Sequence, residues 1–438
     1  VSGQFKAVAA GNVDALNATG NITTTGDLQA RNIKATGKID AGGNISGTVG
    51  NNNVGIYNYG GTVDNYGNVA VGDSDIEFIT GTTDVDVKAS KYSVGIYGEN
   101  ATIINRAGAN ISAGYGGYGI VAKGGAASNF GTVTTTGDYS TGMYTENGVI
   151  TNESGGIINV SGNNTIGMAG KGAGSHIINN GVINITGNDA IGMYGNLGTV
   201  ITNTGTIQSL AASADKAIGM YIGVHGSGVN AGNIRLTAVG TDKDQVGVYN
   251  HSGTFSMGSG NIEVYSQNGA GLYAKAGTVN NLSGGTIKTG NGAIGLYADG
   301  VTINLSGTYK SIVENGGIFA LNNSGSGNIN IASGTIVVDI EAGGMAFSST
   351  GALNTYLSSL VTGSGTLEIN LKDPTSKLAI IDAPGTILLS SIGTAYAPGT
   401  TISGTNVKIS SSSNPNYTPF SITKGTLVID QAVNLNSN

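Results

Sequence analysis

The sequence lacks several residue types on which common folds and sites depend. None of its 438 residues is Cys or Trp, and it has only five Pro and three His. Without Cys, neither disulfides nor thiolate metal sites can hold the chain together. All five prolines lie at or beyond Pro374, so residues 51–310 contain no residue that would break the pairing of a sheet. This long stretch therefore favours continuous strand pairing.

Charged side chains are also scarce, at 10% of the residues against about 25% in ordinary globular proteins. The formal net charge is −7, with only 19 Lys and Arg residues. A nucleic-acid groove needs clustered basic residues, so these values argue against nucleic acid as a partner. No apolar run is long enough to predict a transmembrane segment. Because the chain starts at Val1 with no signal peptide, we interpret it as a mature or excised fragment.

Glycine is abundant instead, and ten of the 76 glycines belong to one repeated signature. Each copy has an aliphatic residue, Gly, a second apolar residue and usually Tyr, and the copies follow 23 to 28 residues apart after a first interval of 40. The signature glycines are Gly55, Gly95, Gly119, Gly142, Gly167, Gly192, Gly219, Gly247, Gly271 and Gly295. Such a period indicates repeating units that pack on their neighbours. We predict an all-β fold, a β-solenoid with coils of about 25 residues.

Strand alternation predicts which side chains of the signature face the core. The aliphatic residues before and after each Gly should point inward, and Gly and Tyr should share the outer face. A run of Met in four successive copies could be a thioether metal stripe, but a stacked apolar core explains it more simply. The predicted inward column is Ile56, Ile96, Ile120, Met143, Met168, Met193, Met220, Val248, Leu272 and Leu296.

The outward tyrosines are the main candidate binding surface. Tyr fails in the series only at Val121 and Ala169, and coils about 4.8 Å apart would align the rings along one side. Tyr offers a large, rigid contact with a polar tip, which suits recognition. The alternative is that each ring merely covers a neighbouring Gly. The candidate ligand-binding residues are Tyr221, Tyr249, Tyr273 and Tyr297.

A second signature, Asn-x-Gly followed by a β-branched residue after one more position, comes about ten residues after the first. Asn tolerates left-handed backbone angles and Gly permits positive φ, so the pair marks a corner between two strands. We expect these amides to hydrogen-bond from coil to coil rather than to bind a glycan or a metal. Copies begin at Asn65, Asn129, Asn179, Asn203 and Asn230, with near-copies around Asn105, Asn152 and Asn281.

Changes in repeat style predict three domains. Residues 1–50 have apolar positions every five or six residues, which indicates short-period β-solenoid coils. Residues 51–310 carry the regular coils. Over residues 311–438 the signature degenerates, with Gly317-Ile318-Phe319 and Gly344-Met345 as the last coils before an irregular β region.

Few residues carry catalytic chemistry. Gly72-Asp73-Ser74 is similar to a nucleophile turn, but such a Ser needs a His partner. His176, His225 and His251 fall at different positions of their coils and do not line up. β-Helical polysaccharide enzymes cluster carboxylates on adjacent coils, whereas the acids here are scattered. We predict that the protein is not an enzyme and needs no cofactor.

Acidic residues gather in the long first interval. Asp73, Asp75 and Glu77 alternate as on an exposed strand, with Asp84 and Asp86 nearby, and their oxygens could bind Ca²⁺. A solvated acidic edge that discourages sheet aggregation explains the same pattern without a metal, and we favour it.

One repeat points to a known family. Ile191-Gly192-Met193-Tyr194-Gly195, followed by Val200-Ile201-Thr202-Asn203-Thr204-Gly205-Thr206-Ile207, resembles the repeat unit of large autotransporter adhesin passengers, the type V secreted surface proteins of Gram-negative bacteria. The resemblance covers roughly residues 51–310, and Gly425-Thr426-Leu427-Val428-Ile429-Asp430 is also similar to such passengers. It implies a right-handed parallel β-helix on the bacterial cell surface, anchored to the outer membrane through a C-terminal barrel absent from this chain. It supplies no ligand-contact residues.

These observations lead to a functional hypothesis. We expect a non-enzymatic adhesin passenger fragment that binds a cell-surface protein or glycan of another bacterium or of a host. The main alternative is a structural protein that self-associates into aggregates, fibres or a surface layer. A polysaccharide-active β-helix enzyme is the third.

Overall fold

The computed structural model is a parallel β-solenoid with coils of about 25 residues, as the signature spacing predicts. It describes short strands within residues 5–41 and then residues 54–78, 87–91, 93–209, 214–237, 244–323, 327–349, 360–373, 375–388, 400–402, 405–411 and 420–428. The chain forms two units, Val1–Ser227 and Gly228–Asn438. The strand β28 (Ser227–Asn230) contains the boundary.

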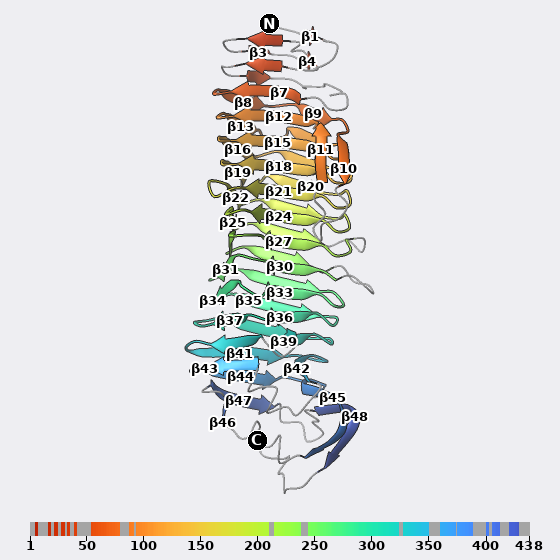
Figure 1. Ribbon diagram of the computed structural model, residues 1–438, viewed down its shortest axis with the longest axis vertical. Helices are drawn as coiled ribbons and strands as arrows, with labels where there is room; N and C mark the ends of the chain where they lie inside the picture. Colours follow the sequence, from red (N-terminus) through yellow and green to blue (C-terminus); the bar gives the residue numbers. More distant parts are fainter. Residues whose placement is uncertain are drawn as a thin grey trace. The chain divides into compact units, whose positions relative to one another are not determined.

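Each coil of the first unit supplies three strands, and like strands of successive coils pair in parallel (Figure 1). The first strands are β7 (Val54–Tyr59), β12 (Val94–Glu99), β15 (Tyr118–Lys123), β18 (Thr141–Glu146), β21 (Ile166–Lys171), β24 (Ile191–Asn196) and β27 (Ile218–Ile222). The second strands are β8 (Thr62–Asn65), β13 (Thr102–Asn105), β16 (Ala126–Asn129), β19 (Val149–Asn152), β22 (His176–Asn179) and β25 (Val200–Asn203). The third strands are β9 (Asn68–Val71), β14 (Asn110–Ala113), β17 (Thr132–Thr135), β20 (Ile157–Val160), β23 (Val182–Ile185) and β26 (Thr206–Ser209).

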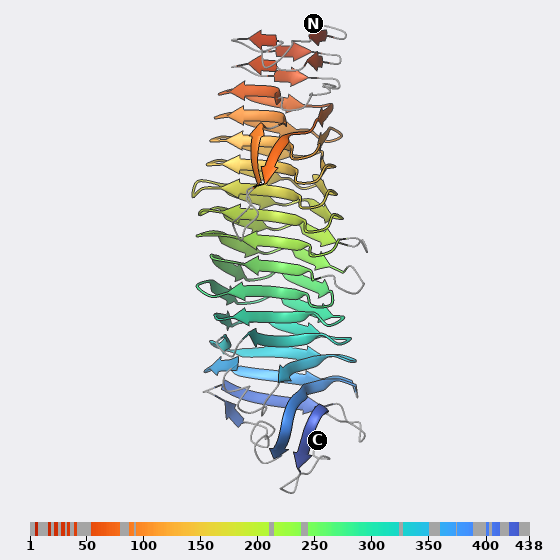
Figure 2. The ribbon, with the colours of Figure 1, turned by 45° about the vertical axis from the view of Figure 1, so that its right-hand side comes forward.

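Short strands precede these coils in the sequence, and an antiparallel hairpin is inserted between β9 and β12 of the coils. The N-terminal strands are β1 (Phe5–Ala7), β2 (Leu16–Ala18), β3 (Ile22–Thr24), β4 (Leu28–Ala30), β5 (Ile33–Ala35) and β6 (Ile39–Ala41). Of these, β5 and β6 pair in parallel with β7 and β8. The long first interval forms an antiparallel hairpin of β10 (Asp75–Phe78) and β11 (Val87–Lys91), whose strands run across the stacked coils (Figure 2).

The second unit repeats the three-strand coil. Its first strands are β30 (Val246–Asn250), β33 (Ala270–Lys275), β36 (Ile294–Asp299), β39 (Ile318–Asn323), β42 (Met345–Ser349), β45 (Lys377–Leu388) and β48 (Phe420–Val428). Its second strands are β31 (Thr254–Met257), β34 (Val279–Leu282), β37 (Thr302–Leu305), β40 (Asn328–Ile331) and β43 (Val361–Gly363). Its third strands are β29 (Asn233–Leu236), β32 (Asn261–Tyr265), β35 (Thr286–Gly290), β38 (Lys310–Val313), β41 (Thr335–Ile340), β44 (Thr366–Leu371) and β47 (Thr405–Ser411), with β46 (Thr400–Ile402) antiparallel to β47.

The predicted inward column is confirmed, because all ten residues after the signature Gly are fully buried. The prediction for the Gly itself is wrong. A Cβ at Gly119 would lie 3.2 Å from Val133 and 3.3 Å from Ile111, so this position also faces the core. Two consecutive inward positions interrupt the alternation. The prediction that the aliphatic residue before Gly points inward is therefore also wrong at positions such as Ile191, which is partly exposed.

The last copies of the signature show the same rule and correct their predicted register. Ile318 pairs with Ile294, so Phe319 occupies the Gly position and Ala320 the position after it. In the next coil Ala346 and Phe347 occupy these two positions. All four of these side chains are fully buried. The Gly position and the position after it both point inward, so one large and one small residue can fill them in either order. Core packing depends on the total volume of the two side chains.

The predicted amide ladder is confirmed in the first unit. Each Asn side chain from Asn65 to Asn179 donates to the amide oxygen of the Asn in the next coil at 2.7 to 2.9 Å, and all of these residues, with the last acceptor Asn203, are fully buried. The ladder contains Asn65, Asn105, Asn129, Asn152, Asn179 and Asn203. In the second unit the expectation for Asn281 is confirmed, because Asn281 accepts a hydrogen bond from Asn304 of the next coil at 3.1 Å, although this amide is exposed. The buried amide of this strand is its neighbour Asn280, which accepts a hydrogen bond from Asn250 at 2.7 Å.

Candidate functional site

The outer side chains of the first strands form a surface that we call the tyrosine face. In the first unit it carries Tyr57, Tyr97, Tyr144, Tyr194 and Tyr221, each partly exposed as predicted. Tyr57 and Tyr97 stack with ring centroids 5.3 Å apart, and Tyr194 and Tyr221 stack at 5.0 Å. Coil stacking thus gives rigid rows of rings, because each ring is held by its neighbour.

The second unit carries three of the four candidate ligand-binding residues in one continuous row. Tyr249 and Tyr273 have ring centroids 5.0 Å apart, and Tyr273 and Tyr297 are 4.7 Å apart. The Tyr273 hydroxyl donates to Asp299 at 3.0 Å. Burial and then this hydrogen bond raise the pKa of Tyr273 well above its ordinary value, so the phenol stays neutral. A ligand-binding role for this row and for Tyr221 stays a prediction.

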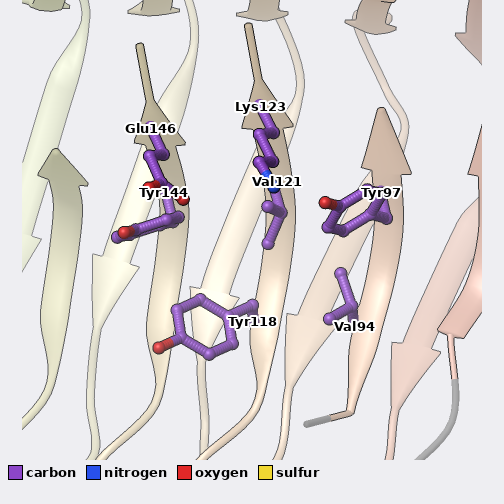
Figure 3. Close-up of a pocket in the computed structure, with 7 residues that line it drawn as sticks. All are labelled: Val94, Tyr97, Tyr118, Val121, Lys123, Tyr144 and Glu146. Carbon is purple, nitrogen blue, oxygen red and sulfur yellow. The ribbon is translucent and has the colours of Figure 1, made fainter. Parts of the chain in front are cut away.

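The tyrosine face has a groove where the row of the first unit is interrupted at Val121. The rings of Tyr97 and Tyr144 lie on either side of Val121, and Tyr118 lies toward the start of the same strands (Figure 3). The groove has a volume of about 230 Å³. Tyr118 stands where neighbouring strands carry Val94 and Thr141, and its ring meets Tyr144 edge-on at 5.6 Å.

Charged side chains close the other end of this groove. Glu99, Lys123 and Glu146 lie in register on β12, β15 and β18, two residues beyond the tyrosine position. Glu99 also accepts a hydrogen bond from the Tyr57 hydroxyl at 3.0 Å. Burial and then this bond raise the pKa of Tyr57 to about 12. The groove therefore combines aromatic walls with a polar end.

Sequence reasoning did not single out this groove. The repeat pattern shows the missing Tyr at Val121 but predicts no site there and no role for Tyr118, Lys123 or Glu146. The available signal was a double exchange within one repeat, in which Tyr disappears at Val121 and appears three residues earlier at Tyr118.

Among the five acidic residues from Asp73 to Asp86 in the long first interval, the structure describes the side chains of Asp73 and Asp75. The Asp73 carboxylate accepts the Tyr115 backbone N–H at 2.8 Å, which ties this segment to the next coil. Asp75 is exposed at the start of β10, while the side chain of Glu77 and residues Asp84 and Asp86 fall outside the described part. Among the side chains that the structure describes, no three His, Asp or Glu gather as metal ligands. The calcium-site hypothesis for Asp73, Asp75 and Glu77 stays untested.

Ser74 has a structural role in the described part of this segment. It is 5% exposed, its hydroxyl accepts the Ser93 backbone N–H at 2.8 Å, and its own N–H donates to the Tyr115 carbonyl at 2.7 Å. His176 lies on β22, His225 precedes β28, and His251 lies 6.0 Å from the Tyr249 ring. These four residues do not form a nucleophile with its base.

The fold and the site define the class of the protein as a parallel β-solenoid with a tyrosine-rich outer face. The chain belongs to the family of the BigA third pectate lyase-like domain, which matches residues 2–232, more than half of its length. A search of curated proteins gave no match. In the part of the chain that the structure describes, no helix has the length and apolarity to span a membrane.

Two phage proteins are among the solved structures similar to this chain. One is the receptor binding domain of the siphovirus 9NA tailspike, with 9% identity, a TM-score of 0.22 and coverage of 96% of this chain and 74% of that one. The other is the tailspike of Escherichia coli bacteriophage HK620 in complex with a pentasaccharide, with 12% identity, a TM-score of 0.26 and coverage of 97% and 70%. TM-scores this low support no inference about shared binding.

Proposed function

We propose that this chain is a non-enzymatic adhesin fragment that attaches a bacterial cell to other cells or to host molecules. The observation that carries the proposal is the tyrosine face, where rings are held 4.7 to 5.3 Å apart by the coils beneath them. Tyr loses little conformational entropy on binding and combines apolar area with a hydroxyl, so such a surface is suited to recognition.

The family agrees with this role. BigA, for which the family is named, is an autotransporter-type adhesin. By analogy the chain would lie outside the cell, carried by an outer-membrane anchor in the autotransporter manner. The partner would be a protein or a glycan on another bacterium or on a host cell.

The charged residues favour binding over catalysis. The ion pairs join neighbouring coils, as between Arg106 and Asp64 or between Lys310 and Asp339, where the atoms are 2.7 Å apart. Such pairs fix the stacking of coils. The polysaccharide-active enzyme is the weaker alternative, because the carboxylates in ion pairs of the described residues, Asp64, Glu263, Glu314 and Asp339, join neighbouring coils instead of gathering at one site.

The test uses a variant in which Tyr221, Tyr249, Tyr273 and Tyr297 are all changed to Ser. Circular dichroism should stay strand-like, because these rings lie on the outer face, whereas attachment of the purified chain to bacterial or host cells should be lost. The control changes the outward residues Asn281, Asn304 and Asn330 of the second unit to Ser, which removes an exposed amide row from the second strands and should leave attachment intact.

Other outcomes would contradict the proposal. Full attachment by the tyrosine variant would remove the tyrosine face from the adhesive contact. Loss of concentration-dependent sedimentation without loss of partner binding would favour the self-associating structural protein. Release of new reducing ends from a glycan polymer by the unmodified chain would show an enzyme.

A further inference from the structure

We propose that the groove over Val121 is a binding slot for one uncharged pyranose ring of a glycan. The inference rests on the proposed adhesive function and names the ligand class of one site within it. The slot consists of Tyr97 and Tyr144 as walls, Val121 as floor, Tyr118 at one end, and Lys123 with Glu146 at the other.

The spacing of the coils sets the width of the slot. Tyr97 and Tyr144 occupy equivalent positions two coils apart, which places them roughly 10 Å apart at ~4.8 Å per coil. Carbon atoms in contact lie about 3.5–4.0 Å apart, so one saturated ring fits between the two walls. Where the row is unbroken, as between Tyr249 and Tyr273, the ring centroids are only 5.0 Å apart and nothing can enter.

Both walls are held in place before any ligand arrives. Tyr57 covers the far face of Tyr97 with the two rings 8° from parallel, and Tyr118 meets Tyr144 edge-on. A preformed site avoids the entropy cost of ordering side chains on binding. The volume of about 230 Å³ is below the 300–1,000 Å³ typical of drug-sized sites, which suits a single ring.

The chemistry of the slot matches a sugar. A pyranose presents C–H groups on its faces and hydroxyls around its rim, so its faces can lie against the Tyr rings while its rim reaches the polar end. The Lys123 side chain is exposed and forms no ion pair or hydrogen bond with any residue in the described part of the chain. Its three N–H donors can therefore bind hydroxyls.

The charges at the polar end favour an uncharged ring. Lys123 lies in register between Glu99 and Glu146, so the charges on the three coils that form the slot sum to −1, and Lys171, in register beyond Glu146, lies one coil outside them. Burial first, and then the charges of Glu99 and Glu146, raise the pKa of Tyr97, so the negative potential reaches its phenol. A uronate or sialate carboxylate would meet this potential, whereas a hexose or N-acetylhexosamine would not.

The test is a glycan array that presents neutral hexose and N-acetylhexosamine glycans beside uronate and sialylated ones, probed with the labelled full chain. We expect binding to neutral glycans. Val121→Tyr completes the tyrosine row and should weaken this binding at least tenfold, with circular dichroism unchanged. Ala169→Tyr is the matched control, because it fills the other interruption, beyond Tyr144, and leaves the slot open.

Two further variants test the slot independently of Val121→Tyr. Tyr97→Ser removes one wall and should also weaken neutral binding at least tenfold, in case the extra ring of Val121→Tyr disturbs the coil. Glu146→Gln removes a negative charge and keeps an acceptor, so binding of acidic glycans relative to neutral ones should rise. An unchanged ratio of acidic to neutral binding with Glu146→Gln would overturn the electrostatic argument for an uncharged ring.

The remaining outcomes separate the slot from the adhesive function. A blank array, binding to acidic glycans alone, or unchanged binding by Val121→Tyr would overturn the slot, even if the unmodified chain attaches to cells. Neutral binding that Val121→Tyr abolishes, with no attachment to cells, would support the slot and contradict the adhesin. Self-association that depends on Val121, together with a blank array, would assign the slot to a side chain of a second copy.

Discussion

At the scale of single residues, Asp339 shows how this protein uses its few charges. It lies on the third strand β41, and its side chain is 10% exposed. Lys310 of the preceding coil lies 2.7 Å away, Lys372 lies 3.6 Å away, and Asn370 donates to it at 3.0 Å. Burial alone would raise the pKa of Asp339, but these partners together hold it below its usual value. The carboxylate thus links three coils.

We expect this residue to make the second unit sensitive to acid. A pKa below the unfolded value of about 3.9 means that the stabilisation is complete above that pH and is lost as the pH falls through the folded value. Urea melts between pH 2 and 6, at roughly half-unit steps, should therefore show a smaller loss of stability on acidification for Asp339→Asn than for the unmodified chain. The control is Glu341→Gln, because Glu341 forms no ion pair in the described part of the chain. An unchanged pH profile for Asp339→Asn would show that the ion pairs contribute nothing.

At the scale of elements, buried amides specify how the second strands align. Asn152 at the end of β19 accepts from Asn129 at 2.8 Å and donates to Asn179 at 2.9 Å, and it is fully buried. A one-residue slip of the strand would turn the amide away from its partners and leave polar groups unpaired inside the coil. The ladder therefore fixes register in a core that is otherwise made of interchangeable aliphatic side chains.

A pair of Asn substitutions tests this role. Asn152→Ala should destabilise the first unit by about 2–4 kcal/mol, because two buried hydrogen bonds are lost and the amides of Asn129 and Asn179 lose a partner. Asn159→Ala removes a partly exposed amide of β20 that accepts from Asn184 at 3.0 Å, and it should cost less than about 1 kcal/mol. Urea denaturation of both variants gives the comparison. An equal loss of unfolding free energy in the two variants would mean that burial does not increase the contribution of the amide ladder to stability.

At the scale of whole units, a coil packs mainly against the coils on either side of it. In the first unit β24 pairs with β21 and with β27, so Met193 is held by the equivalent Met168 and Met220. The stability of such an array is close to a sum of coil terms and nearest-neighbour terms. Damage should therefore stay near its origin.

Hydrogen exchange measures how far such damage spreads. Met193→Asp places an unpaired charge in a fully buried column and should cost several kcal/mol, with loss of amide protection in β21, β24 and β27. Protection in β12 and β15 should persist. Tyr194→Ser, on the outer face of the same strand, should change protection little. A uniform loss across the first unit would show that it unfolds as one cooperative body.

The sequence alone determined the coil length, the inward column and the amide ladder. These features depend on local alternation and on repetition, since a residue such as Met193 needs only the strand period and the copies around it to be assigned to the core. The same reasoning placed Tyr194 and Tyr221 correctly on the outer face. It failed at Gly119, because two consecutive inward residues break the period on which the assignment relied.

The tertiary structure alone decided which positions meet across coils. The large residue Phe319 takes the position of Gly295 of the preceding coil, and the small residue Ala320 takes the position of Leu296. This reversal of large and small residues is visible only once the pairing register is known. The slot over Val121 likewise needs three coils in register to place Tyr97 and Tyr144 on either side of a small residue. A repeat period fixes where a side chain points, but the space between side chains depends on the neighbours in three dimensions, and stacking alone supplies those neighbours.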